Sequence, residues 1–322
     1  MNADRLDIPA RPLLKPWLRR AARDASLTLE YGDSAICLEG KAVSVLVPSV
    51  LPLLDGTRTV VELEEGFESA LRPAVRRVVA VLAEHGALVE GPPVDEAEPS
   101  AAAAALMHAA LYDELTPGDA LDRVAEADVE VVGAARVAAQ VTRLLRQSGT
   151  SLARRVPWEE AGRIGAVVVA APAAAELPAL AAWNARALEK AVTWLQVLPF
   201  NGLFAAVGPL YIPGETCCHE CYQRRRASNV AYPEEFWRLE RQPALVPTAP
   251  GAEAMLAGLA VTTVLRWIAA GDPSPAGVLL AVELAPSPRI SEHVVLRVPR
   301  CSACSPARDL PDPLPWHRAR VA

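Results

Sequence analysis

The sequence predicts an α/β protein in two parts. A small N-terminal domain has the pattern of a winged helix-turn-helix, and a larger Rossmann-type domain carries a four-cysteine metal site. Three observations predict this arrangement. Within the first 91 residues the hydrophobic period changes from strand-like alternation to helical spacing. Further along, apolar strands alternate with helices, and two C-x-x-C motifs follow.

Length and composition set the frame for these elements. The chain has 322 residues, enough for about two domains of roughly 150 residues each. Hydrophobic residues make up 52% and charged residues 22%, a balance that excludes whole-chain disorder. The formal net charge of -6 offers no general attraction for nucleic acid or anionic lipid. The start of the chain lacks the pattern of a signal peptide, so we expect a cytoplasmic protein.

The first 91 residues predict three strands followed by three helices and a short strand. The strands are expected over 27–31, 35–38 and 41–45, with turns at Gly32-Asp33 and Glu39-Gly40. Cys37 in the second strand is predicted to be a buried apolar residue. Helices are expected over 48–54, from Thr59 with Glu62 at capping-box spacing, and over 71–84, followed by a strand over 87–90.

A break in composition separates this region from the rest. Acidic residues and prolines crowd together over 91–99, and no apolar periodicity survives there. We therefore predict an N-terminal domain over 1–91, a linker over 92–105 and a second domain over 106–322, with the alanines at 101–105 read as the start of a helix.

The second domain shows the alternation of a parallel sheet with crossover helices. Strands are expected over 129–133, 150–155 and 165–170, with helices over 136–147 and 177–191. Further strands follow over 194–198, 203–207 and 210–212, then a helix over 252–270 and strands over 278–284 and 293–298. The apolar run 254–270 is interrupted by Arg266 and is too short to cross a bilayer unaided, so we predict a buried helix and no membrane partner.

Four of the six cysteines form two widely separated knuckles, Cys218/Cys221 and Cys301/Cys304. Two such knuckles supply four thiolates to one zinc ion, and with no open position left the metal is structural. Two disulfides or a redox pair are the alternatives, but neither an exported chain nor a thioredoxin-like pattern is indicated. Cys217 is predicted to be a spare, and His219 or His317 remains an alternative ligand.

A turn follows the first strand of this domain, where a Rossmann fold would hold phosphate. The turn needs several glycines, but only Gly133 is present, with Ala135 and Ala138 at the other positions. The side chains of Ala134, Ala135 and Arg136 stand where backbone amides would approach an anion. We therefore predict a degenerate loop without nucleotide. The motifs of serine hydrolases, P-loop proteins and zinc proteases are absent from the sequence.

The segment from Val207 to Arg225, with Gly208-Pro209, Pro213-Gly214 and the first knuckle, is similar to ThiF-like proteins related to ubiquitin-activating enzymes. More narrowly, it resembles the group found beside YcaO cyclodehydratases in thiazole/oxazole-modified peptide and thiopeptide biosynthesis. The segment Leu53 to Val60 (LLDGTRTV) and the later Gly86-Ala87-Leu88 resemble the winged-helix peptide-recognition element of such pathways.

This resemblance implies a non-catalytic adaptor that binds the leader peptide of a precursor and presents it to a separate YcaO cyclodehydratase. It also makes a homodimer plausible. If the strand over 41–45 is a sheet edge, a leader adds to it as a further strand through the backbone of Ala42, Val43 and Ser44. The helix 71–84 would form the other wall, where arginines meet acidic leader residues and Val75 or Val79 receives an apolar one; the arginines are Arg72, Arg76 and Arg77.

Two other functions remain open at this stage. An ATP-dependent adenylating enzyme acting on a peptide or carrier-protein carboxylate would fit the wider ThiF-like family, although the degenerate loop opposes it. A DNA-binding regulator would fit a winged helix, although the net charge of -6 opposes it.

Overall fold

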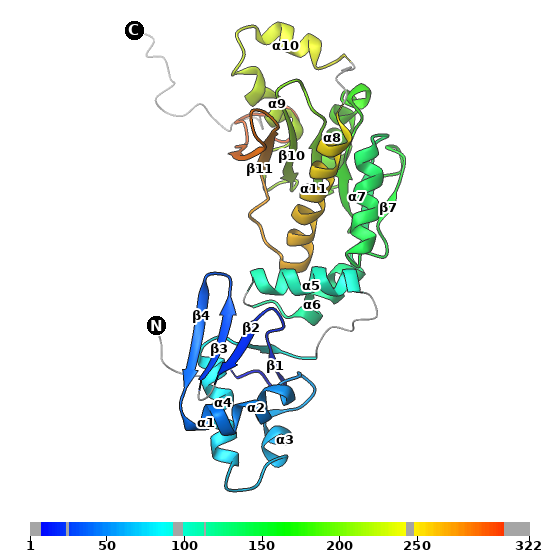
Figure 1. The fold of residues 1–322 in the computed structure, drawn as a ribbon. Coiled ribbons are helices and arrows are strands. Elements are labelled where there is room, and N and C mark those ends of the chain that lie inside the picture. The colour runs from blue at the N-terminus through cyan, green and yellow to red at the C-terminus, as the bar shows by residue number, and fades with distance from the viewer. Residues whose placement is uncertain (1–7, 24–25, 93–98, 113, 243–247, 306–322) are drawn as a thin grey trace, which may run out of the picture. The chain divides into compact units, whose positions relative to one another are not determined.

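The computed structural model describes residues 8–23, 26–92, 99–112, 114–242 and 248–305 (Figure 1). His317 lies outside these ranges. The chain forms two compact units, Met1–Val124 and Ala125–Ala322, and each is considered by itself.

The N-terminal unit contains two small antiparallel sheets and several helices. One sheet pairs β1 with β5, and the other has the order β2-β3-β4 (Figure 1). The strands are β1 (Pro12–Leu14), β2 (Arg19–Arg23), β3 (Ser26–Tyr31), β4 (Ser34–Glu39) and β5 (Leu88–Glu90). The helices are α1 (Lys41–Val45), α2 (Val47–Val50), the 3-10 turn η1 (Leu51–Leu53), α3 (Val60–Glu65), α4 (Arg72–Glu84), α5 (Pro99–Leu111) and α6 (Pro117–Glu126), which reaches the unit boundary.

Local sequence signals explain much of this unit. Thr59 caps α3, and its hydroxyl and backbone exchange hydrogen bonds with Glu62, which confirms the predicted capping box. The core of this unit includes buried side chains from β3 and from the inner face of α4, namely Leu27, Leu29, Val75, Val79 and Leu82, together with residues of β1, α2 and α3. The predicted helix over 71–84 and the predicted strand over 87–90 are both confirmed by α4 and β5.

The prediction of a strand over 41–45 is wrong, because this segment forms helix α1. Gly40, at φ 128°, ends β4 and turns the chain. Beyond it the half-buried Val43 and the buried Leu46 and Val47 lie three and four residues apart, a spacing that buries one face of a helix. The third strand of the sheet is β2, whose five residues are all exposed and therefore carry no hydrophobic pattern.

One further prediction needs correction in this unit. Cys37 of β4 is exposed rather than buried, because the face of β4 that carries it points away from the core. The helix expected to start within 101–105 is confirmed by α5, which begins at Pro99 and buries alanines on one side. The predicted linker and domain bounds stay a prediction.

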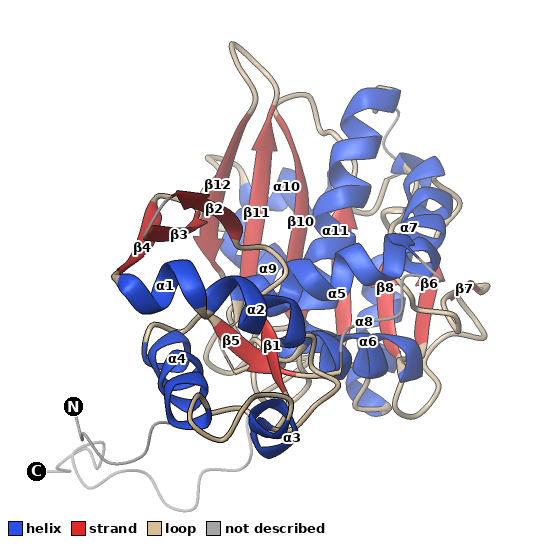
Figure 2. Cartoon of the chain, turned by 60° about the horizontal axis from the view of Figure 1, so that its bottom comes forward, coloured by secondary structure: helices blue, strands red, loops and turns tan. Residues whose placement is uncertain are grey.

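The C-terminal unit is built on one mixed seven-stranded sheet of order β12-β11-β10-β9-β8-β6-β7. Strands β7, β6, β8 and β9 run parallel, and β10, β11 and β12 continue the sheet antiparallel (Figure 2). The strands are β6 (Val129–Val132), β7 (Arg154–Arg155), β8 (Val167–Ala170), β9 (Trp194–Leu198), β10 (Phe204–Tyr211), β11 (Val278–Glu283) and β12 (Arg289–Val294).

Helices cover this sheet. They are α7 (Arg136–Gln147), η2 (Ala174–Glu176), α8 (Ala179–Glu189), α9 (His219–Ala227), α10 (Pro233–Leu239) and α11 (Pro250–Ala270). Every residue of β6 is buried, as expected for a parallel strand covered on both faces. Helix α7 packs against α11, and α8 contacts α9 (Figure 1).

Helix α11 is long and apolar enough to cross a membrane by length and composition, and is alone in this among the helices of the described residues. Ten of its residues are buried in the unit, however, so it is a core helix, in agreement with the prediction. The strands predicted over 203–207 and 210–212 form the single strand β10, whose register shifts between Val207 and Leu210. The last strand lies at 289–294 rather than 293–298.

Candidate functional site

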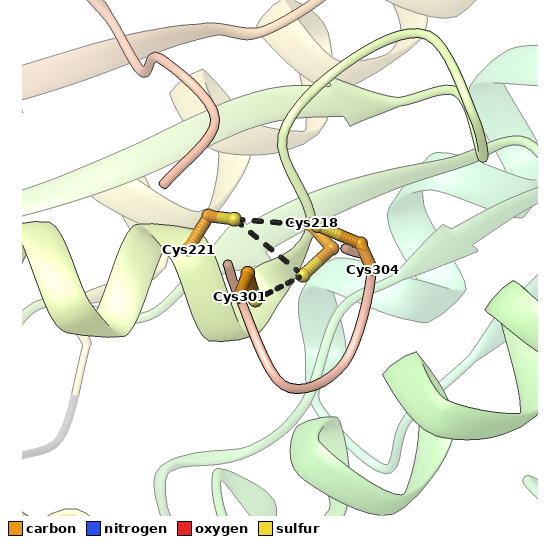
Figure 3. Close-up of side chains that lie close together, drawn as sticks. All are labelled: Cys218, Cys221, Cys301 and Cys304. Atoms are coloured by element: carbon orange, nitrogen blue, oxygen red, sulfur yellow. Dashed lines mark hydrogen bonds between the residues drawn. The ribbon is translucent and has the colours of Figure 1, made fainter. Parts of the chain in front are cut away.

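The four cysteines of the two knuckles come together in the C-terminal unit (Figure 3). Cys218 is the N-cap residue of α9, and Cys221 lies in the first turn of that helix. Cys301 and Cys304 stand on a turn that follows β12, where Arg300 adopts a left-handed conformation at φ 56°. Two segments about 80 residues apart in the chain therefore meet at one point.

The sulfur positions fit one tetrahedral ion. The Sγ atom of Cys218 lies 3.8 Å from those of Cys221 and Cys301, and the Sγ atoms of Cys221 and Cys304 are 3.5 Å apart. All four lie within 4.8 Å of one another. Four sulfurs about 2.3 Å from a zinc ion stand about 3.8 Å apart, whereas a disulfide needs about 2.0 Å. The contacts join both knuckles, so the arrangement matches one four-thiolate metal site better than two separate pairs.

The electrostatics of the cluster favour a cation. Burial raises the pKa of Cys218 to about 12 and also raises the pKa of Cys304. Burial acts to raise the pKa of Cys221 as well, but hydrogen bonds from the backbone at Cys218 and Val298 outweigh it and lower the value. A divalent cation supplies the positive charge that lets all four sulfurs ionise together.

His219, one of the two alternative ligands predicted from the sequence, does not join the cluster, and the other, His317, lies outside the described residues. The ring of His219 points into a buried polar network, where Nδ1 lies 2.6 Å from Oε1 of Gln196 and Nε2 lies 3.3 Å from Nε2 of Gln223. Burial, with a smaller contribution from Arg226, lowers the pKa of His219 to about 3, so the ring is neutral. Cys217 is buried in the core outside the cluster, and burial raises the pKa of its thiol to about 12.

Basic side chains anchor the second knuckle to the rest of the unit. Arg224 of α9 donates to Oγ of Ser302 over 3.1 Å, and Arg225 donates to the carbonyl oxygens of Leu296 and Arg297. Arg297 in turn donates to the carbonyl of Thr216. These bonds hold the turn in place and bring positive charge near the thiolates.

A second candidate site lies at the carboxyl ends of β6 and β8, the switch point where open α/β sheets bind ligands. A cavity of about 270 Å³ opens there, and its lining combines small apolar residues with Arg136, Thr248 and Glu253. Gly133 has φ 113°, and a Cβ atom on it would stand 2.0 Å from the carbonyl oxygen of Ala171. The single glycine of the loop is therefore required by the neighbouring backbone, and needs no phosphate to explain it.

The charged groups of this crevice bind one another. Arg136, the first residue of α7, reaches the buried Glu253 of α11, with Nε 2.9 Å from Oε2. Ala138, at the last position of the degenerate loop, lies in the first turn of α7 and is fully buried. Ala135 is the N-cap residue of α7 and offers no side-chain acceptor to the exposed amides.

A third side chain meets the same turn. One carboxylate oxygen of Glu176, in η2, accepts the backbone N–H of Ala134 over 2.7 Å and that of Ala173 over 2.8 Å. The other oxygen accepts Nε1–H of Trp158 over 3.3 Å. Sequence reasoning missed Glu176 and Glu253, because each lies more than 35 residues along the chain from the loop it completes.

The predicted peptide-binding residues divide into two groups. Ala42, Val43 and Ser44 lie on helix α1, so their backbone does not form a sheet edge. Val75 and Val79 are completely buried in the core of the N-terminal unit and present no surface to a peptide, because the inner face of α4 covers the sheet. The correction follows from helical spacing: both lie on the stripe that faces inward.

The arginines of α4 are exposed, as predicted. Arg76 binds the buried Glu64 through two hydrogen bonds of 2.5 and 2.7 Å, and Glu64 raises the pKa of the guanidinium further. Arg72 donates to the carbonyl of Phe67, and Arg77 lies 3.6 Å from Glu84. Arg76 therefore fastens α4 to α3, while Arg72 and Arg77 remain on the surface.

The described N-terminal residues show a different sheet edge. Strand β4 is terminal in the order β2-β3-β4, and no described strand pairs with its outer side. Ile36 and Leu38 of β4 and Val78 of α4 are half-buried and pack on the core, so part of each remains accessible. The two-residue turn at Gly32-Asp33 was the sequence signal for this strand.

Comparison with solved structures places this architecture among known folds, whereas no protein-family model and no curated protein matches the sequence. The heterocyclase TruD matches with a TM-score of 0.69 and 22% identity over 92% of this chain and 43% of TruD. A heterocyclase in complex with substrate and cofactor matches with a TM-score of 0.68 and 22% identity, over 91% of this chain and 39% of that one.

The match to MccB of E. coli extends over nearly the whole of that protein. Its TM-score is 0.60 at 14% identity, over 95% of this chain and 99% of MccB. MccB in complex with N-formylated MccA matches with a TM-score of 0.59 at 15% identity, over 91% and 99%. This chain thus spans about two fifths of the heterocyclases and nearly all of MccB. The α/β part of the fold expected from the resemblance is confirmed, because the chain has the ThiF-like α/β fold that TruD and MccB share. The winged helix-turn-helix expected for the N-terminal region stays a prediction.

Proposed function

We propose that this protein is a cytoplasmic adaptor that binds the leader peptide of a ribosomally made precursor and presents it to a separate YcaO cyclodehydratase. Its fold is shared with a heterocyclase and with MccB, which forms a complex with the peptide MccA. The chain spans 43% of TruD, and in this proposal a separate protein supplies the cyclodehydratase activity.

The open edge of β4 is the observation that carries the proposal. In a hairpin with a two-residue turn, the closing residues Tyr31 and Ser34 form a hydrogen-bonded pair. Hydrogen-bonded and non-hydrogen-bonded pairs then alternate, which directs the backbone groups of Ala35, Cys37 and Glu39 outward. An extended peptide can add there as a fourth strand and gain both main-chain bonds and side-chain contacts.

In this proposal the leader peptide has an apolar residue and acidic neighbours. Ile36 and Leu38 of β4 are half-buried and offer partly exposed apolar surface for its side chain. Helix α4 is proposed as the other wall of the site, where the exposed Arg72 and Arg77 would supply positive charge. In this proposal the N-terminal region is the winged-helix recognition element expected from the sequence, and β4 takes the role first predicted for residues 41–45.

The C-terminal unit serves in this proposal as a scaffold, held by a structural zinc ion on Cys218, Cys221, Cys301 and Cys304. Zinc with four sulfur ligands has no open position for water or substrate, so it contributes stability and no chemistry. The switch-point crevice supports the same role, because its charged groups already bind one another and leave no amide-lined loop for a nucleotide.

The test uses the full chain and a fluorescent synthetic leader peptide of the precursor encoded next to its gene. Cys37→Pro removes one outward N–H at an edge where proline is tolerated, and Cys37→Ala keeps it. We expect fluorescence polarisation to show binding by the wild type and Cys37→Ala, and at least tenfold weaker binding by Cys37→Pro. Absence of peptide binding by the wild type would contradict the proposal. Equal binding by Cys37→Pro and Cys37→Ala would contradict the site at β4.

Adenylation of a peptide or carrier carboxylate is the second candidate, and the match to nearly the full length of MccB favours it. The ion pair of Arg136 with Glu253 opposes it. ATP–pyrophosphate exchange by the purified protein with the same precursor peptide decides between them, and clear exchange would establish the enzyme.

A further inference from the structure

A cavity of about 480 Å³ opens between helices α8, α9 and α10 of the C-terminal unit. Its volume falls within the range of roughly 300–1,000 Å³ that small-molecule sites occupy. The described residues that line it include none of the four clustered cysteines and no residue of the β6–α7 turn. The cavity is therefore separate from both candidate sites described above.

One side of the cavity is apolar. It consists of Leu177 and Pro178, which come directly before α8, and the indole ring of Trp237 in α10. All three side chains are half-buried, so part of their apolar surface remains in contact with water. A ligand that covers this surface gains free energy from its burial. The apolar side therefore favours a ligand with an aromatic or branched aliphatic body.

The carboxylates on the other side of the cavity already have partners in the chain. Glu220 accepts a hydrogen bond from Nε of Arg224 over 2.8 Å. One oxygen of Glu240 accepts a bond from Nε2 of Gln223 over 2.7 Å, and the other accepts one from Nη1 of Arg226 over 2.9 Å. A cationic ligand would therefore have to displace a bond that the chain makes for itself.

Hydrogen-bond donors without a partner remain on the same side. Arg241 lines the cavity, and its guanidinium forms no hydrogen bond or ion pair with a described residue; the same holds for Nε1–H of Trp237. A guanidinium presents paired N–H groups that match the two oxygens of a carboxylate. A doubly charged phosphate fits less well, because Glu220 and Glu240 add two negative charges to the same lining.

We propose that this cavity binds an organic carboxylate, with the carboxylate group on Arg241 and the apolar body against Trp237, Leu177 and Pro178. The site does not depend on the proposed leader-peptide site, because its residues all belong to the C-terminal unit and β4 belongs to the N-terminal unit. Arg241 recognises the charge of the ligand, whereas Trp237 contributes contact area to any ligand with the same body. The two contributions can therefore be measured separately.

The test uses the full chain and two probes of similar shape, phenylacetate and the neutral phenylacetamide. Ligand-observed NMR titration measures both dissociation constants. We expect phenylacetate to bind at least tenfold more tightly than phenylacetamide. Arg241→Gln should remove this preference by weakening the binding of phenylacetate alone. Arg238→Gln is the matched control and should keep the preference, because Arg238 is exposed on α10 and does not line the cavity.

Trp237→Leu should weaken the binding of both probes by a similar factor, because it reduces the apolar side and leaves the charge unchanged. Circular dichroism establishes that each variant is folded. Absence of phenylacetate binding by the wild type would overturn the proposal, as would equal binding of the two probes. Unchanged phenylacetate binding by Arg241→Gln would also overturn it. Arg241 is exposed, so this variant tests the proposal even if Trp237→Leu does not fold.

Discussion

The four-cysteine cluster and the switch-point crevice lie in the same unit, yet they satisfy their polar groups in opposite ways. At the cluster, four buried sulfurs converge in an arrangement that suits a cation. In the crevice, Arg136 forms an ion pair with Glu253 and the turn amide of Ala134 donates to Glu176, although Oε2 of Glu253 accepts no hydrogen bond. The comparison teaches that charged or polar groups without partners in the chain indicate a ligand. A Rossmann-type fold alone does not indicate a bound nucleotide.

The largest effect is expected when one cysteine of the cluster is replaced. We expect the wild type to carry the one zinc ion per chain that we propose, and Cys301→Ser to lose it and to unfold at a temperature lower by roughly 10 °C or more, because metal-binding energy is folding energy in such sites. Atomic emission measures the metal and calorimetry the melting temperature. Cys37→Ser is the matched control, since Cys37 is exposed in the other unit. Full stability of metal-free Cys301→Ser would show that the cluster needs no cation.

A smaller effect is expected at the glycine of the crevice. Gly133→Ala forces a Cβ atom against the Ala171 carbonyl at a positive φ, and we expect a loss of roughly 2–4 kcal/mol in the free energy of unfolding. Gly258→Ala is the control, because nothing lies within 4 Å of its Cβ position in α11; there we expect a gain of about 0.5–1 kcal/mol. Urea denaturation measures both. An unchanged free energy of unfolding in Gly133→Ala would show that the turn can accommodate a side chain at this position.

The smallest effect should come from the ion pair. Arg136→Ala leaves the buried Glu253 without its cation, and we expect a loss of about 1 kcal/mol, modest because Arg136 itself is 66% exposed. Arg136→Lys should recover part of it. The double variant Arg136→Ala/Glu253→Gln removes the unpaired negative charge and should therefore be more stable than Arg136→Ala in urea denaturation. Equal stability of the two variants would show that Arg136 and Glu253 are not energetically coupled.

The parts of the fold that follow from local patterns could be predicted. The cap at Thr59, the helices over 71–84 and 136–147, the buried strand over 129–133 and the two knuckles all depend on residues near one another in the sequence. The strand over 41–45 could not, because valine favours strands while the burial of Val43, Leu46 and Val47 decides for a helix. Strand β2 could not be predicted either, because its residues show no apolar pattern.

The candidate sites show the same division. The cysteine spacing is a local signal, so all four cysteines that come together in the cluster could be predicted from the sequence. Glu176 and Glu253 are ordinary acidic residues in the sequence, and only the folded chain brings them to the turn at Gly133. Similarly, the edge character of β4 depends on which strand lies on its other side, which composition cannot show.

The separation of the two knuckles also has a consequence for biosynthesis. About 80 residues lie between Cys221 and Cys301, so at roughly 5–20 residues per second the ribosome reaches the second knuckle about 4–16 seconds after the first. During that interval only the first knuckle of the proposed zinc site is present, and its two thiols are too few to close the site. Strands β11 and β12 precede Cys301, so the sheet can be assembled before a metal ion would fasten the last turn to α9.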